Sequence, residues 1–197
     1  MTTWDEVEVG NHQFQIGGLE SGPVTIAAET DVFTVFGSGL LVVHTGISAG
    51  PATVGVELHD NAPPADLDAW DNVAETTVPM IEDLHVMMVD GEVSETLGPI
   101  PAPPSGAVTL RVSTRGRAAN WDRIVDEPCE DYLIQAWPGD PNTPTRQLKS
   151  ADGMWAAAHR DPGSDAAQDD PGIDLTADAT VRIRGPVVTP TRYDHGR

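Results

Sequence analysis

Apolar and polar residues alternate with a period of two along most of the chain up to Pro138, and this alternation constrains the fold more than any other feature. In the stretch EVEVGNHQFQI, Val7 and Val9 would share one face of an extended chain, with Glu6 and Glu8 on the other. Successive side chains of a β-strand point to opposite faces, whereas a helix repeats its apolar positions every three or four residues. The pattern therefore predicts strands.

Similar stretches recur at short intervals and are separated by glycine, proline and asparagine. Besides residues 6–9, the strand-like runs are 13–16, 31–36, 39–46, 52–60, 71–80, 83–93, 106–116 and 130–138. The sequence VDGEV at 89–93 is typical of a β-hairpin. Many short strands with closely spaced turn signals indicate an all-β fold, which we predict to be an antiparallel β-sandwich of about 8–10 short strands.

The alternation also predicts which residues face the core. In the cleanest strands these are Phe14, Ile16, Val54, Val56, Leu58, Val108, Leu110 and Val112, while Arg111 and its outward neighbours would face solvent. The strand EDYLIQAWP at 130–138 carries Tyr132, Ile134 and Ala136 on one face, and Leu133, Gln135 and Trp137 on the other. Two partly apolar faces suit a central strand of the scaffold.

The character of the sequence changes after Pro138. We divide the chain into a β-sandwich domain at 1–138, a short helical extension at 139–160 and an acidic, Pro/Gly-rich C-terminal tail at 161–197. The helix is expected over about 148–160, with Met154, Trp155 and Ala158 as its docking face. Residues 161–178 contain six Asp and no Lys or Arg, a composition typical of a self-repelling linker. A late strand is possible at 180–184, within TVRIR.

The net charge is −20 at pH 7, and its distribution is uneven. No Lys or Arg precedes Arg111, although 17 Asp and Glu residues do. Nucleic-acid binding is disfavoured because its energy comes from neutralising phosphates with Lys and Arg. A basic protein is the partner that such a field attracts. The alternative explanation is that the acidity serves solubility or adaptation to a saline cytoplasm.

The sequence lacks a secretory signal, a membrane span and a second cysteine. MTTWDEVEVG has neither the basic segment nor the apolar run of a secretory signal, so we expect a cytoplasmic protein. No apolar run approaches the roughly 18 residues of a membrane span. Cys129 is the only cysteine, which excludes an intramolecular disulfide.

Catalytic signatures are missing as well. The sequence contains no GxSxG, phosphate-binding loop, GxGxxG, CxxC or HExxH motif. Glu57 and His59 would share a strand face, and with His44 or His85 they could form a cross-strand metal cluster. The acidic groups at 66–71 and 127–131 offer paired carboxylates, as glycoside hydrolysis requires. We expect a non-enzymatic protein without metal or cofactor, and keep a β-sandwich enzyme or a metal- or carbohydrate-binding module as the alternative.

Two long loops, at 60–72 and 115–131, are the best candidates for a binding surface. Both place a tryptophan beside aspartates, and tryptophan is favoured at protein interfaces because it combines apolar area with an N–H donor. A structural role, in which these rings cover the ends of the core, is the competing interpretation. The candidate partner-binding residues are Asp66, Asp68, Trp70, Asp71, Trp121, Asp122 and Glu127.

The order of several segments resembles a known family. EVEVGNHQFQI, DVFTVFGSGLLVVHTG, ATVGVELHD, ETTVPM, VDGEV, VTLRV and EDYLIQAWP follow one another as in the competence protein J family and related actinobacterial proteins. The resemblance covers roughly residues 5–138, and the extension at 139–197 departs from the short members. It implies a small cytoplasmic β protein that acts as an inhibitor of a nuclease, or as an immunity-type protein. It assigns no inhibitory residue.

Overall fold

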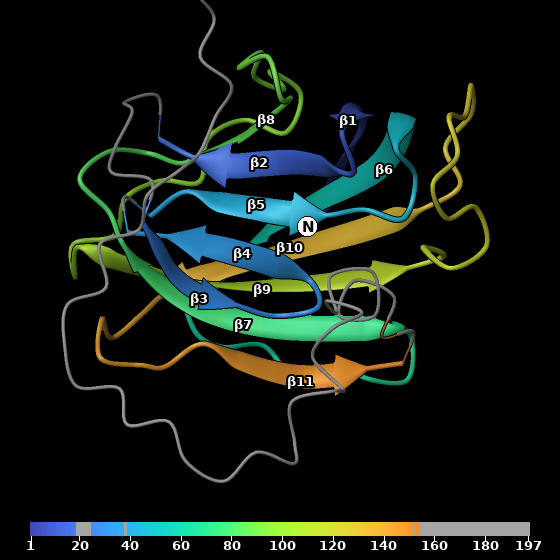
Figure 1. Ribbon diagram of the computed structural model, residues 1–197. Coiled ribbons are helices and arrows are strands. Elements are labelled where there is room, and N and C mark those ends of the chain that lie inside the picture. Colours follow the sequence, from blue (N-terminus) through green and yellow to red (C-terminus); the bar gives the residue numbers. More distant parts are fainter. Residues whose placement is uncertain (19–24, 38, 152, 154–197) are drawn as a thin grey trace, which may run out of the picture. The chain divides into compact units, whose positions relative to one another are not determined.

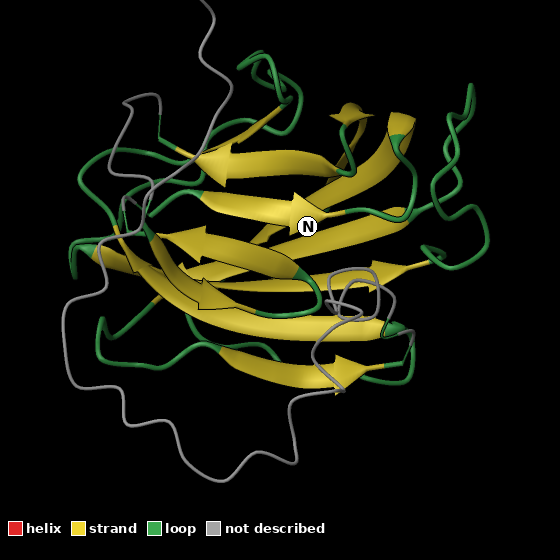
Figure 2. Ribbon diagram, in the orientation of Figure 1, coloured by secondary structure: helices red, strands yellow, loops and turns green. Residues whose placement is uncertain are grey.

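The computed structural model describes residues 1–18, 25–37, 39–151 and 153. These residues belong to one unit, Met1–Arg160, and they contain strands and loops but no helix (Figure 2). No helix able to cross a membrane is therefore present in this part of the chain. The strands are β1 (Thr3–Gly10), β2 (Gln13–Gly17), β3 (Ile26–Glu29), β4 (Phe33–Phe36), β5 (Leu41–His44), β6 (Ala49–Leu58), β7 (Asn72–Pro79), β8 (His85–Met87), β9 (Ala107–Arg115), β10 (Asp131–Pro138) and β11 (Arg146–Ser150).

All the described strands belong to one hydrogen-bonded sheet with the order β11-β7-β9-β10-β6-β1-β2-β5-β4-β3, and β8 pairs with β2 outside this order (Figure 1). The all-β prediction is confirmed. The predicted pair of separate antiparallel sheets is not what the structure shows. The sheet is continuous and mixed, because β6 and β10 run parallel.

The sheet curls at the link between β1 and β2, which rests on a single residue pair, Gly10 with Gln13. The part from β11 to β1 and the part formed by β8 and β2–β5 contribute side chains to the same core. Phe14 of β2 and Tyr132 of β10 meet edge to face, with ring centroids 5.2 Å apart. The two edges of the sheet are also connected, since the Asp31 N–H donates to the Gln147 side chain over 2.9 Å.

The predicted inward faces are mostly correct. Phe14, Ile16, Val54, Val112 and the inward residues of EDYLIQAWP are all buried. Leu58 is the exception, because it lies at the end of β6 and is 51% exposed.

The outer face of β7 and β9 is also buried, against expectation. Arg111 is only 5% exposed and donates a hydrogen bond of 2.9 Å to the carbonyl of Pro63. The loop between β6 and β7 thus covers this face of the sheet. Alternation within β9 could not predict a cover supplied by a distant segment.

The predicted C-terminal helix is wrong at its start. Residues 148–150 belong to β11, which pairs with β7 at the edge of the sheet. The rest of that helix, except for Ala151 and Gly153, lies outside the described residues, as do the acidic tail at 161–197 and the strand at 180–184.

Candidate functional site

A buried carboxylate organises the end of the sheet at which the loop 115–131 begins and ends. Glu130 is 1% exposed, and its two oxygens accept hydrogen bonds from the backbone N–H groups of Gly46 (3.0 Å) and Ile47 (2.7 Å). The hydroxyl of Tyr132, from β10, donates to the same carboxylate over 2.5 Å. A buried charge is tolerated only with such partners. Glu130 therefore fixes the turn between β5 and β6 against β10.

Arg117 reinforces the same region. Its guanidinium is buried and donates to the carbonyls of Asp31 (2.7 Å) and His44 (3.3 Å). A Cβ on Gly46 would come within 2.1 Å of the Arg117 carbonyl oxygen. The HTG sequence thus needs its glycine because the loop 115–131 approaches it so closely.

The middle of the loop 115–131 runs beside the turn between β5 and β6. The N–H of Asp122 donates to the Gly46 carbonyl (2.8 Å), the N–H of Ser48 donates to the Arg123 carbonyl (2.8 Å), and the N–H of Val125 donates to the Ala49 carbonyl (3.0 Å). Ala49 and Ile124 form an isolated parallel bridge. This segment behaves as a short extra strand at the rim of the sheet, held by backbone hydrogen bonds.

The hairpin turn between β1 and β2 completes the arrangement. His12 Nε2 lies 3.0 Å from the Asp122 carboxylate, and the rings of His12 and Trp121 are 5.5 Å apart between centroids. Asn11 and His12 both have positive φ, as a two-residue type I′ turn requires, and Asp122 has a φ of 60°. The segment around Trp121 forms turns and no helix, and the positive φ at Asp122 breaks the run of right-handed backbone there.

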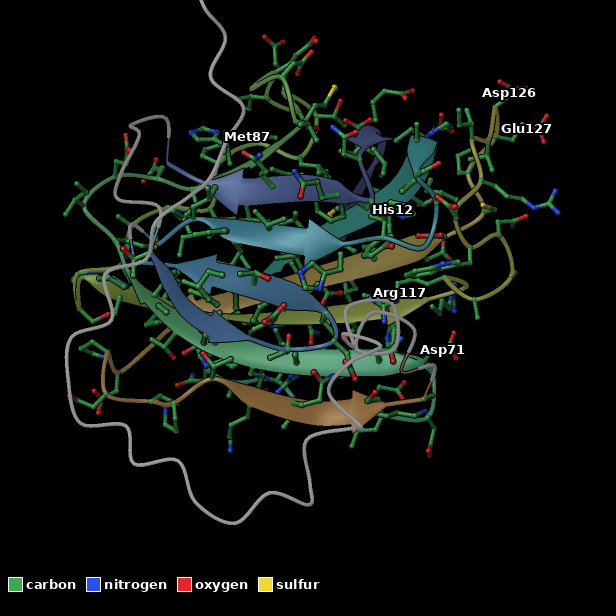
Figure 3. The ribbon with its side chains drawn as sticks, in the orientation of Figure 1. His12, Asp71, Met87, Arg117, Asp126 and Glu127 are labelled. Carbon is green, nitrogen blue, oxygen red and sulfur yellow. The ribbon has the colours of Figure 1, made fainter. Side chains whose placement is uncertain are left out.

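The outer part of the loop carries exposed charge around one exposed apolar side chain. Asp122, Arg123, Asp126 and Glu127 are exposed, and Ile124 is 79% exposed. Figure 3 shows Asp126 and Glu127 projecting from the periphery of the molecule. Val125, next in sequence, is partly buried against the core. The loop therefore has a packed inner side and a charged outer side.

The loop 60–72 is held on the outer face of the sheet by cations. The only lysine, Lys149 of β11, donates to the carbonyls of Leu67 and Trp70, each over 2.7 Å. Trp70 is only 9% exposed, and the guanidinium of Arg115 lies 5.1 Å from its ring centroid. Trp70 is therefore largely buried and packs as part of the scaffold.

The aspartates of this loop are exposed. Asp71 Oδ2 accepts a hydrogen bond of 3.0 Å from the N–H of Gly116, so the two candidate loops meet where they leave the sheet. Asp66 accepts from the N–H of Ala69 (3.2 Å), while Asp68 is exposed at the outer side of the loop. The structure brings Asp71, Trp121, Asp122 and Glu127 to one end of the sheet through these two loops.

A row of polar side chains crosses the outer face of five strands. Glu57 of β6, Gln135 of β10, Arg111 of β9, Glu75 of β7 and Arg146 of β11 are in register across the sheet. Each is hydrogen-bonded to the next, with distances between 2.6 and 3.1 Å. Arg111 also lies over the Trp137 ring, 5.0 Å from its centroid. The side chains of both arginines in this row are therefore hydrogen-bonded within the fold.

Burial alone would raise the pKa of Glu57, but hydrogen bonds from Thr2, Gln135 and His59, together with the charge of His59, lower it from 4.5 to about 2. The carboxylate accepts from the Thr2 hydroxyl over 2.6 Å and lies 3.0 Å from His59 Nε2. Glu57 and His59 therefore bind each other and form no metal cluster with His44 or His85.

His44 itself is buried and lies within hydrogen-bonding distance of Thr34, at 2.9 Å. In the part of the chain that the structure describes, no group of three or more His, Cys, Asp or Glu side chains is arranged to hold a metal ion. Cys129 is half-buried, and both its burial and the nearby Glu130 raise the pKa of its thiol. This keeps the thiol protonated, as expected for a structural cysteine.

A pocket of about 320 Å³ lies at the opposite ends of β6, β9 and β10. Its walls are mainly apolar and include Leu58, Trp137 and the proline-rich segment 100–104. The only ionisable side chains in its walls are those of His59 and Asp60. The acidic groups proposed above as paired carboxylates lie elsewhere, so the pocket contains no pair of acids for glycoside hydrolysis.

Sequence reasoning missed Ile124 and His12. Ile124 stands in WDRIVDEP, where a single β-branched residue before an inward-facing valine is the only signal of its position. His12 lies in the hairpin turn, and its contact with Asp122 joins segments that are far apart in the sequence.

Comparison with known proteins gives matches in structure only. No protein-family model and no curated protein matches the chain. Among solved structures, "Crocagin biosynthetic gene J" is 10% identical, with a TM-score of 0.45 over 71% of this chain and 98% of that one. ComJ from Bacillus subtilis, described as an inhibitor of the DNA-degrading activity of NucA, is 14% identical, with a TM-score of 0.44 over 71% of this chain and 99% of that one. ComJ has the name of the family that the sequence resembles.

Proposed function

We propose that the chain is an acidic, non-enzymatic binding protein of the inhibitor type, which covers a basic surface of a partner protein. The observation that carries the proposal is that most cations contact groups of the same chain, whereas the carboxylates of the two loops are exposed. The cations of the described chain, Arg123 apart, contact groups of the same chain: Arg111, Arg115, Arg117, Arg146 and Lys149. The carboxylates at the outer sides of the two loops are left to face solvent.

Such an arrangement favours a basic partner for a simple reason. A surface with exposed carboxylates, whose cations mostly contact groups of the same chain, produces a negative field, which speeds encounter with a positive surface and repels phosphates. The loops are also held in place by backbone hydrogen bonds and by Lys149, so little conformational entropy is lost on binding. A rigid, acidic rim is suited to blocking a cleft that is built to hold nucleic acid.

The first partner to test is a nuclease, which the resemblance to the competence protein J family implies. The full-length chain is added to the DNA-degrading fraction that a cation exchanger retains from an extract of the source cells. We expect inhibition that weakens as the salt concentration rises, because the attraction is between exposed charges.

A matched pair of variants separates a specific surface from general acidity. Asp126→Asn with Glu127→Gln neutralises the tip of the loop 115–131, and Asp90→Asn with Glu92→Gln removes equal charge beside β8. We expect the first pair to slow association about tenfold at low salt and the second to have little effect. Equal effects of the two pairs would show that association depends on the overall charge and on no specific surface of the loop 115–131, and an absence of inhibition would refute the proposed role.

A further inference from the structure

Ile124 is exposed at a position where the fold gains nothing from an apolar side chain. It is 79% exposed, whereas its neighbour Val125 packs against the core. Single exposed apolar residues are common on protein surfaces. This one differs because its surroundings are charged and its backbone is fixed.

The backbone on both sides of Ile124 is held from within. The Arg123 carbonyl accepts from Ser48, and the Val125 N–H donates to Ala49. Within the described residues, the N–H and C=O of Ile124 itself form no hydrogen bond. They stand at an open edge, where a partner chain can pair with them.

The side chains around Ile124 define the chemistry of the partner. Asp122, Asp126 and Glu127 are exposed on the same segment together with one cation, Arg123, so the carboxylates outnumber it and the segment is acidic. An apolar anchor within a polar rim is the usual anatomy of an energetically important contact between proteins. The complementary surface is an apolar platform bordered by basic groups.

Clefts that hold a nucleic-acid strand have these two features together. Basic groups follow the phosphates, and apolar or aromatic side chains provide a platform on which bases stack. We infer that the segment 122–127 occupies such a cleft as a substitute for the substrate, with its carboxylates at the positions of phosphates and Ile124 on the platform for a base. The inference rests on the proposed function and adds to it the residue that anchors the contact and the site that it blocks.

The test compares two exposed isoleucines. Ile124→Ala removes the anchor, and Ile81→Ala removes an isoleucine that is 93% exposed outside the loop 115–131. Each full-length variant is titrated into the basic DNA-degrading fraction, with fluorescently labelled DNA as substrate. We expect Ile124→Ala to raise the inhibition constant about 30-fold, from the apolar area that it no longer buries. Ile81→Ala should change the constant less than about twofold, as expected of a surface substitution away from the contact.

The mode of inhibition tests the same idea independently. Because the loop and the DNA would occupy one cleft, more DNA should raise the concentration of the chain needed for half inhibition. Inhibition that is insensitive to DNA concentration, or an Ile124→Ala variant as potent as the wild type, would overturn the inference and leave the proposed function intact. A wild-type chain without any inhibitory effect would overturn both.

Discussion

The substitution Glu130→Gln should destabilise the protein far more than its conservative chemistry implies. Gly46 and Ile47 donate to different oxygens of this carboxylate, and an amide has only one oxygen. The amide nitrogen must then face a backbone N–H, so at least one donor is left unsatisfied in a site that is 1% exposed. Hydrogen bonds to a charged group contribute about 1.5–3 kcal/mol each, and a buried unsatisfied donor costs a similar amount, so we expect a loss of about 3 kcal/mol.

Equilibrium unfolding in urea, followed by tryptophan fluorescence, measures this loss. The neighbouring Asp131→Asn is the matched control, because Asp131 makes its ion pair with Arg115, whose side chain is 52% exposed. Exposed pairs contribute about 0–1 kcal/mol. Hydrogen exchange at the Gly46 and Ile47 amides should accelerate in Glu130→Gln only. If both variants unfold within about 0.5 kcal/mol of the wild type, the Glu130 carboxylate is not the organising group that the geometry indicates.

Two further predictions concern the sheet and its turns. The pKa of Glu57 is lowered to about 2, so its stabilising effect is complete above its ordinary pKa and disappears as the pH falls towards 2. The stability difference between the wild type and Glu57→Gln, from urea unfolding at several pH values, should therefore shrink by about 2 kcal/mol between about pH 6 and pH 2, and a constant difference would contradict this. Gly46→Ala should cost about 3 kcal/mol or more, because its Cβ would lie 2.1 Å from the Arg117 carbonyl oxygen. Gly37→Ala, where the nearest atom is at 3.6 Å, is the control, and equal melting temperatures for the two variants would refute the steric argument.

Local alternation was sufficient to predict most of the strands and their inward faces. β2 and β10 bury the residues that a period of two selects, because one face of each strand meets the core. The same reasoning fails for β9, where Arg111 is buried by a loop that crosses from elsewhere. It also fails for β11, whose RQLKS sequence has no apolar alternation and which adds to the edge of the sheet through backbone pairing. The parallel pairing of β6 and β10 depends on topology, which no short stretch encodes.

The candidate surface was predicted in part for similar reasons. Acidic and loop-forming residues identify the loops 60–72 and 115–131 by composition. Sequence cannot show that Trp70 is covered by Arg115, or that Ile124 is turned outward while Val125 packs inward. Those facts depend on contacts between distant segments.

The parallel pairing of β6 and β10 also has a consequence for biosynthesis. β6 ends at Leu58, but its parallel neighbour is complete only at Pro138. While the chain emerges from the ribosome, the apolar strands of its first half therefore lack β10, their central neighbour. They lack it until most of the protein has been made. Contacts between segments so far apart slow folding. During this interval the 17 Asp and Glu residues that precede Arg111 oppose association of the incomplete chains by mutual repulsion, because no Lys or Arg lies among them.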